Sequence, residues 1–143
     1  MIHLLDVNVL IALLDPDHIF HPMARRWFDD VGRLGWATCP ITENGTIRIL
    51  GNPRYPLGPG SPGAVITLMR DLRTFEGHEF WPDDLSLLTA PSLDVSAMTS
   101  PGRVTDTYLL ALAVAKGGSL ATFDSRLSPL GVHGGPEALH VIV

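Results

Sequence analysis

Short apolar runs alternate along the chain with stretches whose apolar residues recur at helical spacing. Continuous apolar runs are typical of buried parallel strands, and we expect strands at residues 2–5, 36–39, 79–81, 119–123 and 140–143. Helical spacing predicts helices over residues 8–14, from Pro22, over 41–50, after Ser61-Pro62, and from Ser100-Pro101 to Lys116. The helix from Pro22 is expected to bury a stripe of Ala24, Trp27, Phe28, Val31 and Leu34.

Alternating strands and helices predict an α/β fold with a central, mostly parallel sheet of four to five strands and helices on both faces. A length of 143 residues fits a single domain over residues 1–143. The segment from Gly51 to Gly63 is rich in proline and glycine, which indicates a loop.

Composition narrows the class of protein. The 45% hydrophobic fraction and 17% charged fraction exclude a disordered chain, and one cysteine, Cys39, excludes a disulfide framework. No apolar run approaches the ~18 residues of a membrane span, and the start lacks a basic segment and a cleavage site, so we expect a cytoplasmic protein. The formal net charge of −5 argues at first against a nucleic-acid partner.

Acidic residues follow the predicted strands or begin the predicted helices. Asp6 and Asp124 each end a strand, Glu43 lies in the first turns of one helix, and Asp106 lies early in another. Because sites in open α/β sheets form beyond the carboxyl ends of the strands, we expect the four carboxylates to converge. Each one alone is also compatible with a capping or turn role.

Buried carboxylates need a cationic partner, and few basic residues lie near these positions in the sequence. Oxygen ligands suit Mg²⁺ or Mn²⁺ rather than zinc or copper. Such a site is suited to phosphodiester hydrolysis by a water that the metal activates. Without these four residues the net charge of −5 becomes −1, so the acidic balance does not exclude RNA.

In residues 4–14, 39–48, 104–113 and 120–124 the sequence resembles PIN-domain ribonucleases, and more closely the VapC toxins of bacterial toxin–antitoxin pairs. The segments around His18 to Trp27 and His78 to Asp84 resemble one VapC subgroup. The resemblance spans nearly the whole chain and is weakest in the loop at 51–63. It implies a PIN-like fold and assigns the metal-binding, catalytic role to Asp6, Glu43, Asp106 and Asp124.

The same resemblance implies an Mg²⁺- or Mn²⁺-dependent endoribonuclease that cuts a structured RNA such as a tRNA or ribosomal RNA. It also implies inhibition by a VapB antitoxin, a homodimer and a toxin–antitoxin hetero-oligomer. These properties come from the family and not from composition or spacing.

Other polar residues have both functional and structural interpretations. Asn8, Thr42, Thr105 and Thr122 flank the carboxylates and could orient them, although capping and local backbone hydrogen bonding are the more common roles of such residues. The arginines that could bind RNA phosphate are Arg25, Arg48 and Arg54.

Two other functions compete with the ribonuclease. One is a catalytically inactive PIN scaffold that binds proteins, against which the complete set of four carboxylates argues. The other is a phosphatase with an aspartyl nucleophile, which would need a second aspartate at position 8, where this chain has Asn8.

Overall fold

A five-stranded sheet, with every pairing parallel, runs through the computed structural model, which describes residues 1–143. The strands lie in the order β3-β2-β1-β4-β5. Their bounds are β1 His3–Leu5, β2 Trp36–Thr38, β3 His78–Phe80, β4 Ser119–Thr122 and β5 Leu139–Val141. The predicted parallel sheet is therefore confirmed, at the upper end of the expected strand number.

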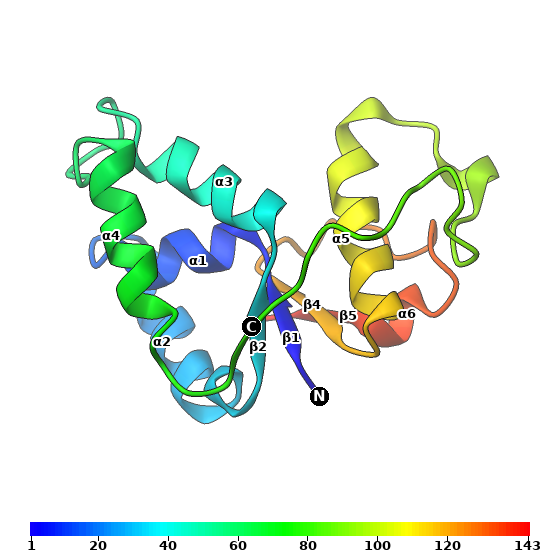
Figure 1. Cartoon of the computed structure of the whole chain (residues 1–143), viewed down its shortest axis with the longest axis horizontal. Helices are drawn as coiled ribbons and strands as arrows, with labels where there is room; N and C mark the ends of the chain where they lie inside the picture. The colour runs from blue at the N-terminus through cyan, green and yellow to red at the C-terminus, as the bar shows by residue number, and fades with distance from the viewer.

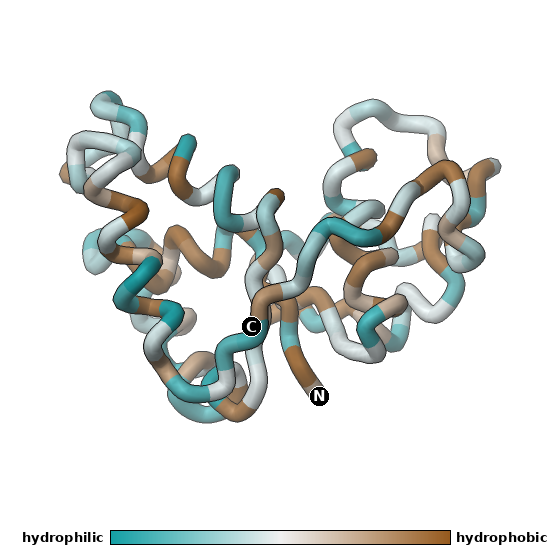
Figure 2. The backbone as a smooth tube through the Cα atoms, viewed as in Figure 1, coloured by the Kyte–Doolittle hydropathy of each residue, from teal (hydrophilic) through white to brown (hydrophobic).

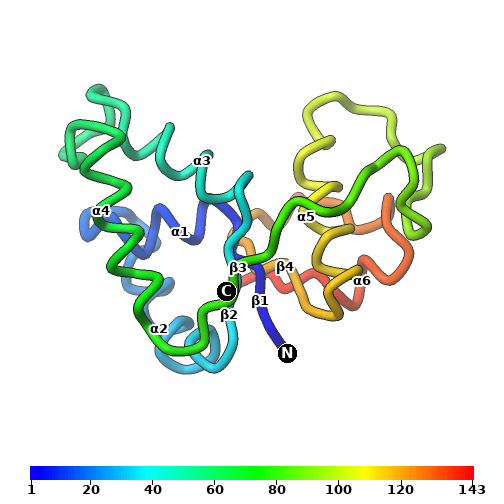
Figure 3. The backbone as a smooth tube through the Cα atoms, viewed as in Figure 1, coloured from blue at the N-terminus to red at the C-terminus, as the bar shows by residue number.

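Helices cover both faces of the sheet, as predicted (Figure 1). On one side lie α1 (Val7–Leu14), α2 (His21–Asp30), α3 (Pro40–Leu50) and α4 (Pro62–Leu72). On the other side lie α5 (Val104–Ala115) and the short α6 (Gly135–Ala138). Residues 81–100 cross from β3 to the side of α5 (Figure 3). None of the helices has the length and apolar composition that crossing a membrane requires.

Two apolar clusters, one on each side of the sheet, make up the core. Successive side chains of a strand point to opposite faces, so Leu5 joins the cluster under α1 and Leu4 joins the cluster under α5. Both leucines are fully buried, which explains why apolar residues are consecutive at the end of β1 instead of alternating with polar ones. Hydrophobic residues follow α1 and α5 where they run beside the strands (Figure 2).

The apolar stripe predicted for α2 is partly wrong. Ala24, Trp27 and Phe28 are buried, but the helix ends at Asp30. Val31 and Leu34 therefore lie outside it, 37% and 82% exposed. The chain turns back on Trp27 at Gly32, where a Cβ atom would lie 2.7 Å from the indole ring, so the helical spacing cannot continue through this point.

The ends of other elements also differ from the sequence expectation. A 3₁₀ turn over Pro101–Arg103 precedes α5, which begins at Val104 instead of Pro101. Strand β3 ends at Phe80, and the short α6 has no periodic pattern that could have predicted it. These shifts leave the order of the elements unchanged.

Strands β1 and β4 are neighbours at the centre of the sheet, and the chain leaves their carboxyl ends toward opposite sides. In open α/β sheets such a switch in strand order leaves a crevice in which ligands bind. Asp6 follows β1 and Asp124 follows β4, so the fold places both at this crevice.

Candidate active site

Asp6 is the most buried carboxylate at the crevice, with 8% of its surface exposed. It caps α1: its Oδ1 atom accepts a hydrogen bond of 2.8 Å from the backbone N–H of Val7. Its other oxygen, Oδ2, accepts a bond of 2.8 Å from the Thr122 hydroxyl. Burial raises the pKa of Asp6, and the charge of Asp124 adds to the rise, whereas the two hydrogen bonds oppose it.

Thr122 joins the ends of β1 and β4. Its fully buried hydroxyl donates to Asp6 and accepts bonds from the Asn8 amide (3.0 Å) and the backbone N–H of Asp124 (3.1 Å). The Asn8 Oδ1 atom in turn accepts a bond of 3.1 Å from the backbone N–H of Phe123. Of the two roles that the sequence left open for Asn8 and Thr122, the hydrogen bonds favour orientation of the Asp6 carboxylate.

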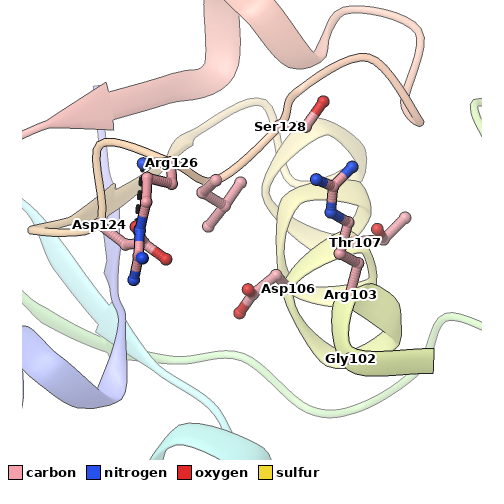
Figure 4. A pocket seen from close by; sticks show the side chains of 8 residues that line it. Gly102, Arg103, Asp106, Thr107, Asp124, Arg126 and Ser128 are labelled. Atoms are coloured by element: carbon pink, nitrogen blue, oxygen red, sulfur yellow. Dashed lines mark hydrogen bonds and ion pairs between the residues drawn. The ribbon is translucent and has the colours of Figure 1, made fainter. Parts of the chain in front are cut away.

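Asp106 completes a group of three aspartates. It lies in the first turn of α5 and is half-buried. Burial raises its pKa, and the negative charges of Asp6 and Asp124 raise it further. Figure 4 shows Asp106 and Asp124 pointing into the same space from α5 and from the turn after β4. The three aspartates thus repel one another at neutral pH, which is the situation that a bound cation relieves.

Asp124 is the only one of the three that has a basic partner. The Nε atom of Arg126 lies 3.6 Å from its Oδ1, and the Arg126 backbone N–H donates to the same oxygen at 2.9 Å. Because the Arg126 side chain is 92% exposed, solvent screens this pair and it contributes little to stability. The arginine is free to turn toward an anionic ligand instead.

Glu43, the fourth predicted ligand, does not join the aspartates. Its Oε2 atom accepts a bond of 2.6 Å from the Thr38 hydroxyl and lies 3.4 Å from a guanidinium nitrogen of Arg73. The Thr38 hydroxyl has one proton, which it gives to Glu43, so it accepts from the Nε2–H of His78 at 2.8 Å. Glu43 thus faces the end of β2 and the residue that caps α4, while the residue after it on α3, Asn44, lines the crevice between α3 and α5.

Two cavities open beside Asp106. The first, which we call the α5–β4 cavity, has a volume of about 310 Å³ and is lined by Asp106 and Asp124 together with Arg103, Arg126 and Ser128. Figure 4 shows these side chains around it. The second, the α3–α5 cavity, has a volume of about 810 Å³ and is lined by Asp6 and Asp106 at one end and by α3 along its side. The carboxylates therefore lie between two spaces that a polymeric ligand can enter.

The remaining predicted residues divide into two groups. Arg48 and Thr105 line the α3–α5 cavity. Thr42 instead exchanges hydrogen bonds with Cys39 at the start of α3 and contacts none of the carboxylates, so its role is capping. Arg25 lines a separate pocket between α1, α2 and α4, and Arg54 lies exposed in the 51–63 loop.

Three arginines near the site were not singled out from the sequence. Arg126 follows Asp124 by two residues and Arg103 precedes Asp106 by one helical turn, so proximity in sequence could have indicated both. Arg73 is 30 residues from Glu43 in the sequence, and no sequence pattern predicts this ion pair. Only the packing of α4 beside α3 brings them together.

The donor chemistry of the site suits a hard divalent cation, because all three converging side chains are carboxylates. Neither Asp6 nor Asp106 forms an ion pair with a lysine or arginine of the chain. No three His, Cys, Asp or Glu side chains form a group that could hold a metal ion by themselves. The residues fit a cation by charge and donor type, and Mg²⁺ commonly takes further ligands from water.

Comparison with known proteins gives consistent matches. Residues 3–131 match the model of the PIN domain family. Ribonuclease VapC44 of Mycobacterium tuberculosis is 47% identical to this chain over 131 residues, which cover 92% of each protein. Ribonuclease VapC39 of the same organism is 44% identical over 128 residues, which cover 90% of this chain and 92% of VapC39. A crystal structure of Mycobacterium tuberculosis VapC20, titled a Sarcin-Ricin loop cleaving toxin, is similar in fold, with a TM-score of 0.59 and 18% identity over 92% of this chain and 96% of that one.

Proposed function

Because this chain belongs to the PIN-domain family, we propose that it is a VapC-type toxin, an endoribonuclease that depends on Mg²⁺ or Mn²⁺. The observation that carries the proposal is the group of Asp6, Asp106 and Asp124 at the switch point of the sheet, where the first two carboxylates have raised pKa values and no cationic partner. The names of relatives that are 44–47% identical support ribonuclease activity.

In this proposal Asp6 and Asp106 hold the cation and Asp124 completes the group. A bound divalent cation would supply positive charge to the phosphate and acidity to the attacking water. Thr122 favours the ionised form of Asp6 by donating to its carboxylate, and Asn8 holds the Thr122 hydroxyl in that orientation. Arg73 and Thr38 both hold the Oε2 atom of Glu43, so its family role as a ligand would use Oε1 or require that it leave this ion pair.

The substrate class in this proposal is a structured RNA, such as a tRNA or ribosomal RNA. The chain lacks a broad basic face, with a net charge of −5, but arginines flank the carboxylates on both sides. Arg103 and Arg126 line the α5–β4 cavity and Arg48 lines the α3–α5 cavity. A guanidinium binds phosphate through two parallel N–H groups, so a few placed arginines can position the strand.

The proposed partners follow from the VapC names of the relatives. We expect a VapB antitoxin to inhibit the enzyme, and we expect a homodimer and a toxin–antitoxin hetero-oligomer. An RNA target places this activity in the cytoplasm. The alternative of an inactive scaffold is not favoured, because such a protein has no need of three carboxylates that repel one another.

The test is cleavage of total tRNA and ribosomal RNA by the purified protein. We expect defined cuts with Mg²⁺ or Mn²⁺ and none after addition of EDTA. Asp6→Asn should lower the rate by about 10³-fold or more, because the substitution removes charge from the most buried carboxylate at the crevice. Asp29→Asn, at an exposed position on α2, is the matched control. Equal cleavage by the Asp6→Asn variant and the wild type would overturn the proposal.

A further inference from the structure

The α3–α5 cavity is larger than a cation site needs. Its volume of about 810 Å³ lies within the range of ~300–1,000 Å³ that small-ligand sites occupy. Asp6 and Asp106 line one end, and apolar side chains that include Ile41 and Leu109 form a wall between α3 and α5. Arg48 also lines the cavity, and a cationic side chain beside an apolar wall matches a ligand that has both an anionic and a flat apolar part.

Two polar side chains of α3 line this cavity and have no ion-pair or hydrogen-bond partner within the chain. Arg48 takes part in none of the three ion pairs of the chain, and Asn44 has no hydrogen-bond partner for its side chain. Both residues are exposed, so neither is needed to stabilise the core. The guanidinium suits a phosphate, and the amide presents one donor and one acceptor side by side.

The packing of Gly45 shows where Asn44 and Arg48 lie along the cavity relative to Asp6. A Cβ atom at Gly45 would lie 2.8 Å from the Val7 side chain, so this turn of α3 packs directly beside the residue that follows Asp6. Asn44 adjoins this point, and Arg48 lies one turn farther along α3, a rise of about 6 Å. The cavity therefore presents, in order, the carboxylates, the amide and the guanidinium.

We propose that the α3–α5 cavity is a subsite for the nucleotide next to the phosphodiester that is cut. Arg48 binds the phosphate of that nucleotide, and Asn44 hydrogen-bonds the edge of its base, which lies against the apolar wall. The paired donor and acceptor of an asparagine amide match the adenine edge, so the subsite prefers adenine. This inference rests on the proposed ribonuclease function and assigns Arg48 and Asn44 to substrate binding, not to the chemical step.

The test separates binding from cleavage. Isotope-labelled protein is titrated with AMP and, separately, with UMP in the presence of Mg²⁺, and backbone and side-chain amide NMR signals are followed. We expect AMP to shift the signals of Asn44, Arg48 and Thr105 and to bind several-fold more tightly than UMP. Arg48→Met should weaken AMP binding by about tenfold, and Asn44→Ala should abolish the preference for AMP. Arg70→Met, which removes an exposed arginine of α4 outside the cavity, is the matched control.

Kinetics on RNA give a second, independent readout. Arg48→Met should raise KM with little change in kcat, because the lost contact is present in both the bound substrate and the transition state. One outcome is that the wild type cuts RNA while Arg48→Met and Asn44→Ala bind AMP and cut RNA equally well. That result would refute the subsite and leave the ribonuclease proposal standing. If AMP binds in the cavity but no RNA is cut, the ribonuclease proposal fails and the nucleotide site remains.

Discussion

The Thr122 hydroxyl is the point at which a single change tests the architecture of the site. The substitution Thr122→Val keeps the shape of the side chain but removes three hydrogen bonds: one to Asp6, one from Asn8 and one from the backbone N–H of Asp124. The hydroxyl is fully buried, so water does not replace it.

The expected cost follows from these bonds. A bond between neutral groups contributes about 1 kcal/mol and a bond to a carboxylate about 2 kcal/mol, and polar groups left without partners add to the loss. The two neutral bonds and the one bond to Asp6 together contribute about 4 kcal/mol, and because Asp6 keeps its bond to the Val7 N–H we expect the free energy of unfolding to fall by about this amount. At roughly 3 °C per kcal/mol for a chain of this size, the melting temperature falls by about 12 °C.

Thermal and urea denaturation in EDTA measure this loss. Thr46→Val is the matched control, because Thr46 is equally buried but its hydroxyl donates only to the Thr42 carbonyl within α3. The loss for Thr122→Val should also shrink in acid, because the Thr122 bond stabilises the ionised form of Asp6 and lowers its pKa. A loss no larger than that of Thr46→Val would refute the idea that this hydroxyl organises the site.

Three further substitutions test separate parts of the structure. Asp106→Asn should raise the melting temperature of the metal-free protein at pH 7 to 8. The pKa of Asp106 is raised in the fold, so the stability of the wild type falls as pH rises through that pKa. The gain in melting temperature should vanish in acid, and thermal denaturation across pH measures it. Arg73→Met should tighten Mn²⁺ binding measured by calorimetry, because it frees the Glu43 carboxylate. Arg70→Met, within α4, should leave the affinity unchanged, and equal affinities for the two variants would contradict this. Gly118→Ala should cost more than ~2 kcal/mol in urea denaturation, because the added carbon would lie 2.4 Å from a backbone carbonyl oxygen. Gly117→Ala should cost only ~1 kcal/mol, since its left-handed backbone (φ +69°) is open to solvent; equal losses would contradict the packing argument.

The local pattern of the sequence was sufficient for the elements of the fold. Buried parallel strands favour consecutive apolar residues, and β1, β2 and β4 contain Leu4-Leu5, Trp36-Ala37 and Leu120-Ala121. The pattern failed where a tertiary contact overrides it, as at Gly32, where close packing on Trp27 ends the helical stripe before Val31. Short elements such as α6 lack a full period and leave no signal.

The sequence likewise predicted part of the candidate site and missed the part that depends on tertiary contacts. The sequence by itself determined which carboxylates stand at strand ends and helix starts, because strand direction and helix polarity fix where Asp6, Asp106 and Asp124 emerge. Only the tertiary structure decided which way each side chain faces. Glu43 and Asn44 are neighbours on α3, yet a helix turns them to different surroundings, so one meets Arg73 and the other lines the cavity. That outcome depends on how α4 and α5 pack beside α3, and contacts between residues far apart in sequence have no local signature.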